Sequence, residues 1–269
     1  MKIASYNVAG IRARADHFWP WLEREQPDSV LIQEIKAQDD TFPFERAATA
    51  GYQAHVVGQK GFNGVAIMTK GASTLVIDHL PGEDDDRQAR YLEVDYHGLR
   101  LACLYLPNGN PINDPVKFPY KLRWMARLKN RMAATLSQEI PALFGGDYNV
   151  CPSPKDIWDE AANASEAHVQ PEVRAAWFAM KNLGLTEVRG ANHDFTFWDF
   201  QAGRFQKDQG LNIDFMLVTP QLADRLLDAG VDQDARNGGA GADRGTDRGA
   251  SKPSDHAPIW ATFSGLSGL

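Results

Sequence analysis

The stretch Ala142-Leu143-Phe144-Gly145-Gly146-Asp147-Tyr148-Asn149-Val150 joins a short apolar run to a carboxylate and an amide. A short apolar run that ends at glycine is typical of a buried β-strand, so we expect a strand over residues 142–145. Asp147 and Asn149 then follow directly after the end of that strand. The tripeptide Tyr-Asn-Val recurs at residues 6–8, at the end of another β-rich run. This recurrence hints at an architecture built from two related halves.

The rest of the chain mixes strand-like and helix-like patterns. Further β-rich runs cover residues 2–8, 29–33, 64–69, 91–96, 99–104, 213–218 and 258–263. Helical patterns cover residues 18–24, 44–50, 120–136, 171–183 and 221–229. The dipeptide His97-Gly98 predicts a tight hairpin turn between two of the runs. Because strands, hairpins and helices do not alternate strictly, we expect an α/β protein with mixed sheets rather than a barrel.

The chain has 269 residues, a length that suits one large or two small domains. No linker-like stretch divides its middle, so we expect a single domain over residues 1–265. Residues 237–251 are rich in Gly, Ala, Asp and Arg, and we expect them to form a mobile surface loop.

Composition and charge exclude several classes of protein. With 43% hydrophobic and 23% charged residues, the chain is neither disordered nor a coiled coil. The net charge of 28 − 35 = −7 argues against coating polyanions by net charge alone, and it leaves room for a local basic patch. Cys103 and Cys151 lie in apolar stretches, which fits a reducing compartment without a disulfide framework. The first residues do not resemble a signal peptide, and no apolar run is long enough to span a membrane.

Polar residues gather at the ends of the expected strands. They are Asn7, Glu34, Asp147, Asn149, Asp214, Asp255 and His256. Because strand ends lie along common edges of a sheet, such residues can converge on one crevice. Oxygen ligands from Glu34 and Asp255, together with the Asn7 amide, suit a hard cation such as Mg²⁺ or Mn²⁺. No His/Cys set has the spacing of a zinc site.

Asp255-His256, with a second aspartate, suits an imidazole that is oriented and charged as in hydrolytic dyads. A Ser-His-Asp triad that uses the adjacent Ser254 is a competing interpretation. We disfavour it because Ser254 lacks a Gly-x-Ser-x-Gly elbow. Walker A and dinucleotide-binding fingerprints are absent in the proper context, which disfavours chemistry with a nucleotide cofactor.

The segment 121–131 is rich in basic residues. They are Lys121, Arg123, Arg127, Lys129 and Arg131. Apolar residues interleave with them at helical spacing, which predicts a helix with one face packed inward and the other basic. The helix is either a solvated amphipathic surface or a contact for a phosphate backbone. Arg12 and Arg14 lie just past Asn7 and would extend such a phosphate-backbone contact.

Eight blocks of sequence, in this order, resemble the exonuclease III family of the endonuclease/exonuclease/phosphatase superfamily. They are residues 4–14 (ASYNVAGIRAR), 31–36 (LIQEIK), 61–67 (GFNGVAI), 105–109 (YLPNG), 146–150 (GDYNV), 195–200 (FTFWDF), 210–214 (GLNID) and 252–258 (KPSDHAP). The resemblance runs over essentially the whole chain, to about Phe263. It implies a four-layer α/β sandwich, in which two stacked mixed β-sheets are flanked by helices.

The resemblance also implies how the metal and the attacking water are held. Glu34 would be the principal Mg²⁺ ligand, supported by Asn7 and Asp255, with Mn²⁺ as a substitute. Asp147 would take the proton from the attacking water. Asn149 would orient that water and bind the phosphate.

On the phosphate side, the resemblance implies that Tyr105 and Asn108 contact the phosphate beside Asn149. His256, held by Asp214, would be the cation that stabilises the pentavalent phosphorane. A metal and an imidazolium would then neutralise the charge that builds on the phosphate oxygens, while a carboxylate activates water in line.

Phe197, Leu211 and Ile213 match the family's small apolar pocket, which accepts a flipped deoxyribose without its base and excludes an intact nucleotide. Their alternative is ordinary core packing. Two positions depart from many relatives. Ala9 stands where they have Asn or Asp, which puts a second metal site in doubt. Asn212 stands where they have Arg, which predicts a weaker backbone contact or an altered lesion preference.

The resemblance therefore implies a Mg²⁺-dependent DNA repair nuclease that acts on duplex DNA. It would cut on the 5′ side of abasic sites and at 3′ ends, as an AP endonuclease, 3′-to-5′ exonuclease and 3′-phosphatase or phosphodiesterase. One alternative is a superfamily phosphatase or phosphodiesterase for another ester, such as an inositol phosphate or a lipid head group. Another is a DNA-binding module without catalysis, which would lack a metal ligand or a base. We expect a monomer without an obligate protein partner, located in the cytoplasm and at the nucleoid if the source is a prokaryote.

Overall fold

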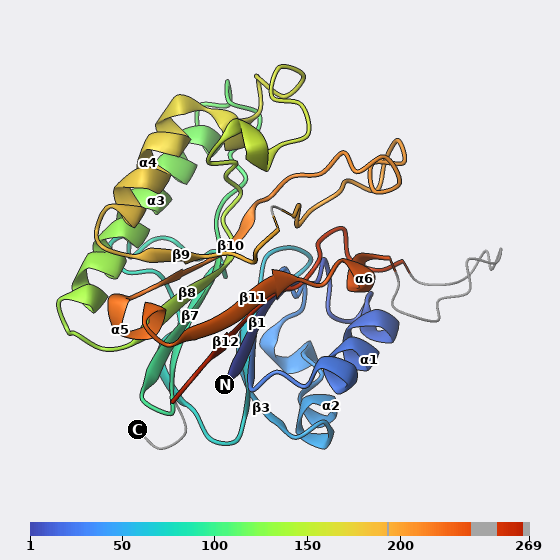
Figure 1. The fold of residues 1–269 in the computed structure, drawn as a ribbon, viewed down its shortest axis with the longest axis vertical. Coiled ribbons are helices and arrows are strands. Elements are labelled where there is room, and N and C mark those ends of the chain that lie inside the picture. The colour runs from blue at the N-terminus through green and yellow to red at the C-terminus, as the bar shows by residue number, and fades with distance from the viewer. Residues whose placement is uncertain (193, 238–251, 266–269) are drawn as a thin grey trace.

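The computed structural model describes residues 1–192, 194–237 and 252–265. Two six-stranded sheets lie face to face between two groups of helices, which makes four layers (Figure 1). This is the predicted architecture of two stacked mixed sheets flanked by helices. The predicted mobile loop 237–251 lies outside the described residues, except for Asn237.

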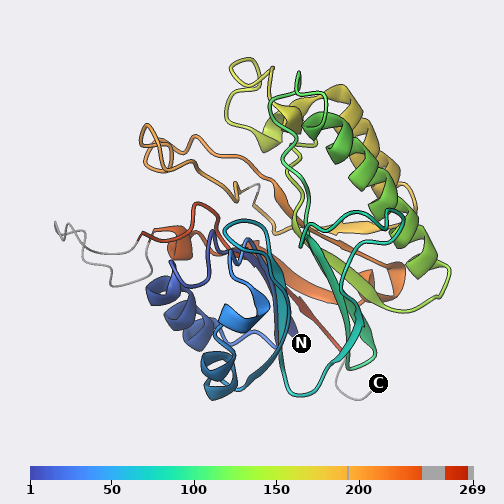
Figure 2. The same cartoon turned by 180° about the vertical axis from the view of Figure 1, so that it is seen from behind.

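The first sheet has the strand order β11-β12-β1-β2-β4-β3. Its strands are β1 (Lys2–Asn7), β2 (Ser29–Gln33), β3 (Tyr52–Val57), β4 (Val65–Lys70), β11 (Leu226–Val231) and β12 (Ile259–Phe263). Strands β1 and β2 are parallel, and all other neighbours are antiparallel. Its outer face is covered by α1 (Ala15–Glu25) and α2 (Phe44–Thr49), seen from behind in Figure 2. The short helix α6 (Gln233–Arg236) follows β11.

The second sheet has the strand order β5-β6-β7-β8-β10-β9. Its strands are β5 (Thr74–Ile77), β6 (Tyr91–Tyr96), β7 (Leu99–Tyr105), β8 (Ala142–Asp147), β9 (Thr186–Val188) and β10 (Asp214–Val218). Helices α3 (Lys117–Leu136) and α4 (Pro171–Lys181) cover its outer face, and α5 (Pro220–Ala223) follows β10. Short 3₁₀ helices occupy Asp39–Thr41, Pro154–Asp156 and Ala167–Val169. Among the described residues, no helix combines the length and the apolarity needed to cross a membrane.

The two sheets are built alike. In each, one parallel pair lies at the centre and two antiparallel strands extend on either side, so β1 corresponds to β7 and β2 to β8. The expectation of two related halves therefore holds for the architecture. The repeated tripeptide does not mark equivalent positions, because residues 6–8 end β1 whereas residues 148–150 follow β8.

Alternating side chains build three hydrophobic layers. In β10, Met216 and Val218 face the core between the sheets, whereas Phe215 and Leu217 face α3 and α4. This is the two-residue period of a strand that is buried on both faces. The central strands are buried along their whole length, as the pattern of β2 and β8 shows. The core therefore holds the ends of these strands in place from both sides.

Every strand predicted from the sequence is present, and the strands that were missed are the four at the sheet edges. Strands β3 and β11 flank the first sheet, and β5 and β9 flank the second. Their residues are mostly half-buried or exposed. An edge strand pairs on one side and packs weakly, so it lacks the apolar pattern that identifies a central strand.

The helix predicted over residues 221–229 is wrong. Helix α5 ends at Ala223, and the chain continues as β11, which pairs with β12. Leu222 and Leu226 have helical spacing, but Gly230 lies under the Trp260 ring, where a Cβ would come within 2.9 Å of the indole. Pairing with β12 and this close approach override the local pattern.

Candidate active site

The predicted polar residues meet at one edge of the sandwich. Asn7 and Asp147 end the central strands β1 and β8, and Glu34 follows β2 directly. Asp214 begins β10 opposite Asp147, because the two strands run antiparallel. His256 precedes β12, which runs antiparallel to β1. Strand direction therefore brings residues from distant parts of the chain to one place.

One pocket at this edge contains most of the predicted site. Of the residues expected from the sequence, those that line it are Glu34, Tyr105, Asn108, Asp147, Asn149, Phe197, Leu211, Ile213, Asp255 and His256. Asn7 and Asp214 lie behind this lining and hydrogen-bond to it. Arg12, Lys121 and Arg123 are not part of the lining.

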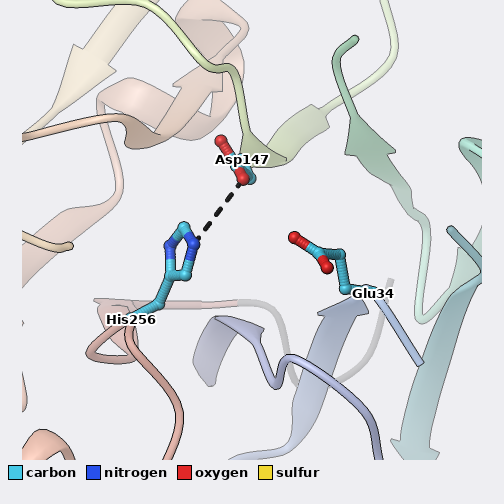
Figure 3. Close-up of side chains that lie close together, drawn as sticks. All are labelled: Glu34, Asp147 and His256. Atoms are coloured by element: carbon cyan, nitrogen blue, oxygen red, sulfur yellow. Dashed lines mark ion pairs between the residues drawn. The ribbon is translucent and has the colours of Figure 1, made fainter. Parts of the chain in front are cut away.

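Three potential ligand atoms converge in the pocket (Figure 3). Atoms of Glu34, Asp147 and His256 all lie within 4.8 Å of one another. The Asn7 Nδ2 donates to Glu34 Oε1 and to Asp147 Oδ2, at 3.0 Å each, so it joins the two sheets at this point. Its oxygen accepts the N–H of Ala9. In this arrangement Asn7 is a hydrogen-bond donor to both carboxylates, and a ligand role for its oxygen stays a prediction.

Glu34 is held as a carboxylate. Burial favours its neutral form, but the Lys36 ammonium 2.8 Å away and the hydrogen bond from Asn7 hold the pKa of Glu34 below its usual value. Glu34 has a φ of 50°, a left-handed conformation that is uncommon for a residue other than glycine. A buried, ionised oxygen ligand of this kind suits a hard divalent cation.

Asp147, His256 and Asp214 form a buried chain. The His256 Nδ1 lies 2.9 Å from Asp214, and its Nε2 lies 3.8 Å from Asp147. Burial favours the neutral ring, but the charges of Asp214, Asp147 and Asp255 raise the pKa of His256 to about 10. Burial and the charge of Asp214 raise the pKa of Asp147 to about 7. The site therefore combines a cationic imidazole with a carboxylate that titrates near neutral pH, as a general base requires.

The part of the pocket where phosphate contacts are expected from the sequence is built from two loops. The Asn149 Nδ2 donates to Leu106 O at 2.9 Å, and the Asn108 Nδ2 donates to Asn149 Oδ1 at 3.2 Å. The Asn149 N–H in turn donates to Asp147 at 2.9 Å. Burial and the nearby carboxylates raise the pKa of Tyr105 well above its usual value, so this phenol stays a neutral donor. Asn108 and Asn149 thus lie together beside Asp147.

The three apolar residues expected to accept a base-less sugar do lie together. Phe197 and Leu211 pair through backbone hydrogen bonds, and the Phe197 ring lies 4.9 Å from the His256 ring, tilted by 58° to it. Ile213 is buried, whereas the other two are half-buried in the pocket wall. Their outer faces are therefore available to a substrate next to His256.

The prediction of a basic face on the helix over residues 121–131 is wrong for most of its residues. Lys121 is fully buried, and Arg127 and Arg131 form ion pairs with acidic residues of the protein. Lys121 therefore cannot contact a phosphate backbone at the surface. Arg123 is exposed, as is Arg12 in the turn between β1 and α1, and a DNA contact for these two stays a prediction.

Arg131 should contribute strongly to stability, although it was predicted as a surface residue. It makes two hydrogen bonds, of 2.6 and 2.7 Å, to Glu93, which is fully buried. Arg131→Met is expected to lower the free energy of unfolding by about 3–5 kcal/mol, because it leaves a buried carboxylate without its main partner. Arg123→Met removes an exposed pair at 4.0 Å and should cost less than about 1 kcal/mol. Urea denaturation of both variants checks this, and equal losses would contradict it.

Ser254 does not form a catalytic triad. Its hydroxyl is buried, donates to Asn7 O at 2.6 Å and accepts the backbone N–H of His256. The His256 ring is engaged with Asp214 and Asp147 instead. Asn212, the second departure from many relatives, is buried and donates to Asp156 at 3.1 Å, beside the Arg189 guanidinium. It lies outside the pocket lining, so it acts on the site only through its neighbours.

Sequence reasoning missed several residues of the site, among them Lys36 and His168. Lys36 pairs with Glu34, and its position two residues later in the same sequence block was an available signal. His168 lines the pocket, and its buried Nε2 has no hydrogen-bond partner within the part of the chain that the structure describes. Burial and the nearby cations Lys121 and Arg174 lower the pKa of His168 to about 4. Nothing in the sequence around this histidine indicated that it would reach the pocket.

Comparisons with known proteins agree with this geometry. The model of the Endonuclease/Exonuclease/phosphatase family matches residues 4–256. Exodeoxyribonuclease III from Haemophilus influenzae is 33% identical, over 98% of this chain and 100% of that protein. The structure of an AP endonuclease from Archaeoglobus fulgidus superimposes with a TM-score of 0.87 at 30% identity, covering 98% of this chain and 99% of that one. The structure of a 3′ phosphatase from Neisseria bound to a product DNA hairpin superimposes with a TM-score of 0.86 at 30% identity. It covers 98% of this chain and 99% of that one. The chain therefore belongs to the endonuclease/exonuclease/phosphatase family, as does its exodeoxyribonuclease III relative.

Proposed function

We propose that this pocket hydrolyses phosphodiester bonds of duplex DNA at 3′ ends and on the 5′ side of abasic sites. The chain is a hydrolytic DNA repair nuclease, as its exodeoxyribonuclease III and AP endonuclease relatives indicate. The observation that carries the finer proposal is the convergence of Glu34, Asp147 and a cationic His256 beside an apolar wall. The 3′ phosphatase from Neisseria supports activity on 3′ ends, and the AP endonuclease from Archaeoglobus fulgidus supports incision at abasic sites.

The acidic part of the pocket fits a magnesium ion. Glu34 and Asp147 supply carboxylate oxygens within 4.8 Å of each other, and Asp255 lines the same pocket. Such a set suits Mg²⁺, with Mn²⁺ as a substitute. Glu34 would hold the ion, supported by Asp255 and by Asn7 if its amide turns. When bound, the ion would neutralise negative charge on the phosphate.

Residues of the protein supply proton transfer, positioning of the phosphate and water, and stabilisation of the developing charge. Asp147 accepts the proton of the attacking water, because its raised pKa makes it a base near neutral pH. Asn149 and Asn108 hold the phosphate and the water in line. His256, kept cationic by Asp214, donates to a phosphate oxygen as charge builds there.

The apolar wall selects the substrate. Phe197, Leu211 and Ile213 offer no hydrogen-bonding side chain, so they suit a deoxyribose that lacks its base. Arg12 and Arg123 would contact the DNA backbone outside the pocket. We also propose that the enzyme works as a monomer, since one chain supplies the whole pocket. A cytoplasmic location, at the nucleoid in a prokaryote, fits two buried cysteines that are not paired.

Cleavage of end-labelled duplexes tests the proposal. One duplex carries a single abasic-site analogue, a second is undamaged with a recessed 3′ end, and a third ends in a 3′-phosphate. Each is incubated with Mg²⁺ or with EDTA. Metal-dependent cleavage of these duplexes is expected, and the relative rates rank the three activities. Cleavage of a generic phosphodiester but of none of the duplexes would instead support a superfamily phosphatase.

Glu34→Gln should raise the Mg²⁺ concentration needed for half-maximal activity by about tenfold or more, because an amide is a weaker ligand than a carboxylate. A Mg²⁺ titration of the cleavage rate measures this. Glu166→Gln is the matched control, since Glu166 lines the same pocket but bonds to Asn110 and lies outside the ligand cluster. An unchanged titration for Glu34→Gln would contradict the ligand assignment.

A further inference from the structure

We propose that Lys121 is a positioning residue that holds the phosphate-binding side of the pocket in place. This inference rests on the proposed function of the same site. Lys121 lies on α3, outside the pocket lining, and touches none of the reacting groups. It acts through the backbone of the two loops that carry Asn108 and Asn149.

The Lys121 ammonium group donates hydrogen bonds to both of these loops. Its side chain is fully buried, and its Nζ donates to Pro107 O at 3.0 Å and to Asn149 O at 2.7 Å. Pro107 directly precedes Asn108 in the sequence. One side chain therefore fixes the backbone on both sides of the Asn108–Asn149 hydrogen bond.

Together with the Asn108 and Asn149 side chains, Lys121 joins the two loops by hydrogen bonds on both sides. Asn149 donates to Leu106 O, and Asn108 donates to Asn149, so the two loops are already joined on the pocket side. Lys121 joins the same two loops from the side facing α3. With bonds on both sides, neither asparagine can shift without breaking a hydrogen bond, and those of Asn149 to Leu106 and of Lys121 to the two loops are buried. Preorganised donors of this kind are what phosphate chemistry needs, because small displacements reduce the rate strongly.

The chain also makes room for this lysine. Gly109 has a φ of +85°, and a Cβ there would lie 2.6 Å from the Lys121 Cδ. A side chain at position 109 would therefore push the lysine stem away from its two carbonyl partners. The loop that carries Asn108 is shaped around Lys121.

A general structural role explains Lys121 poorly. Its neighbours on α3, Arg127 and Arg131, are paired with carboxylates, whereas Lys121 forms no ion pair with any described residue. Burial lowers the pKa of Lys121 to about 7, so keeping a lysine here is unfavourable for folding. A methionine would fill the same space without the cost of burying an ammonium group, but it would leave the Pro107 and Asn149 carbonyls without their donor. The two carbonyls that it binds belong to the phosphate-binding loops, which accounts for its retention.

Lys121→Met tests the inference by removing the donor and keeping the length of the stem. At saturating Mg²⁺ and duplex, kcat is expected to fall by roughly 10- to 100-fold, the scale for misplaced catalytic groups. The inhibition constant of inorganic phosphate should rise by roughly tenfold, because Asn108 and Asn149 no longer align. The Mg²⁺ concentration for half-maximal activity should stay within about twofold of wild type, because Lys121 does not touch the Glu34 side.

Thr219→Val is the matched control for lost stability. Thr219 is fully buried and accepts the N–H of Ala142, at the end of β8 opposite to Asp147. The Thr219→Val substitution should lower the melting temperature. It should leave kcat per folded molecule and the inhibition constant of phosphate unchanged. Lys121→Gln, which keeps an amide donor, should show a smaller loss than Lys121→Met and serves if the methionine variant does not fold.

A folded Lys121 variant with kcat within twofold of wild type and unchanged phosphate inhibition would overturn the inference. So would an equal loss of kcat in Thr219→Val, since that would show a general effect of stability. Failure of the proposed function is distinguishable, because the wild-type enzyme would then cut none of the three duplexes. Failure of this inference alone leaves wild-type cleavage intact.

Discussion

Asp147→Asn is expected to bind duplex DNA like the wild type and to cleave it about 10²-fold or more slowly, the usual scale for a general base. The asparagine fits the same space, but it cannot accept the proton of the attacking water. The amide oxygen can keep the hydrogen bond from the Asn149 N–H, now 2.9 Å from Asp147. The amide nitrogen then faces the Asn7 Nδ2, which now donates to Asp147 at 3.0 Å, so the site stays assembled once the Asn7 amide turns to present its oxygen. Single-turnover cleavage and equilibrium binding of the same labelled duplex separate the two effects.

Glu93→Gln is the matched control for this prediction. Glu93 is another buried carboxylate, but it lies within β6 and pairs with Arg131, away from the pocket. It should lose stability and keep its cleavage rate per folded molecule. A wild-type rate for Asp147→Asn would show that another group takes the proton.

Asp214→Asn should slow cleavage by about 10²-fold or more at pH 8, and the loss should depend on pH. In the wild type the neighbouring carboxylates raise the pKa of His256 to about 10, so the ring is cationic at pH 8. Without the charge of Asp214, the pKa of His256 falls toward its ordinary value of about 6.5 or below, since burial favours the neutral ring. At pH 8 the variant then lacks the cation that stabilises the phosphorane.

The sign of the pH effect follows from the protonated form being the active one. Lowering the pH from 8 to 6 increases the fraction of imidazolium in the variant and adds almost none in the wild type. Loss of the Asp214 charge also lowers the pKa of Asp147 in the variant, which acts in the same direction. The ratio of variant to wild-type rate should therefore rise as the pH falls. The wild-type rate itself should fall over the same range, because Asp147, with a pKa of about 7, becomes protonated. A ratio that is constant between pH 6 and 8 would contradict the assignment of His256 as the cation.

The interior strands of the fold could be predicted because their local pattern and their environment agree. Strands such as β2 and β8 are buried on both faces, so their residues are apolar throughout and the assignment needs no tertiary information. The edge strands β3, β5, β9 and β11 carry no such pattern. Their pairing depends on an edge supplied by a neighbour, which is a property of the folded sheet and not of the segment.

The candidate site divides in a similar way. One polar residue after a buried strand is usually a turn former, so Asn7, Glu34 and Asp147 were informative only as a set, at strand ends that can share one edge of a sheet. The basic segment on α3 misled, because a list of charged residues does not say which side of a helix faces the protein. Only the packing of α3 on the second sheet turns Lys121 inward to the loops of the pocket, and Arg131 inward to Glu93.

By itself, then, the sequence determined the fold class, the metal-assisted nuclease chemistry and most of the residues that line the pocket. The four-layer fold and the nuclease chemistry followed from the resemblance to the exonuclease III family. The mixed α/β class and the acidic cluster followed from residue type and position at strand ends, which are local properties. The tertiary structure alone decided which charged groups are paired, where His168 and Lys36 reach the site, and how Asp214 sets the charge of His256. Such contacts join residues far apart in the chain, so their distances and burial exist only once the two sheets have packed together.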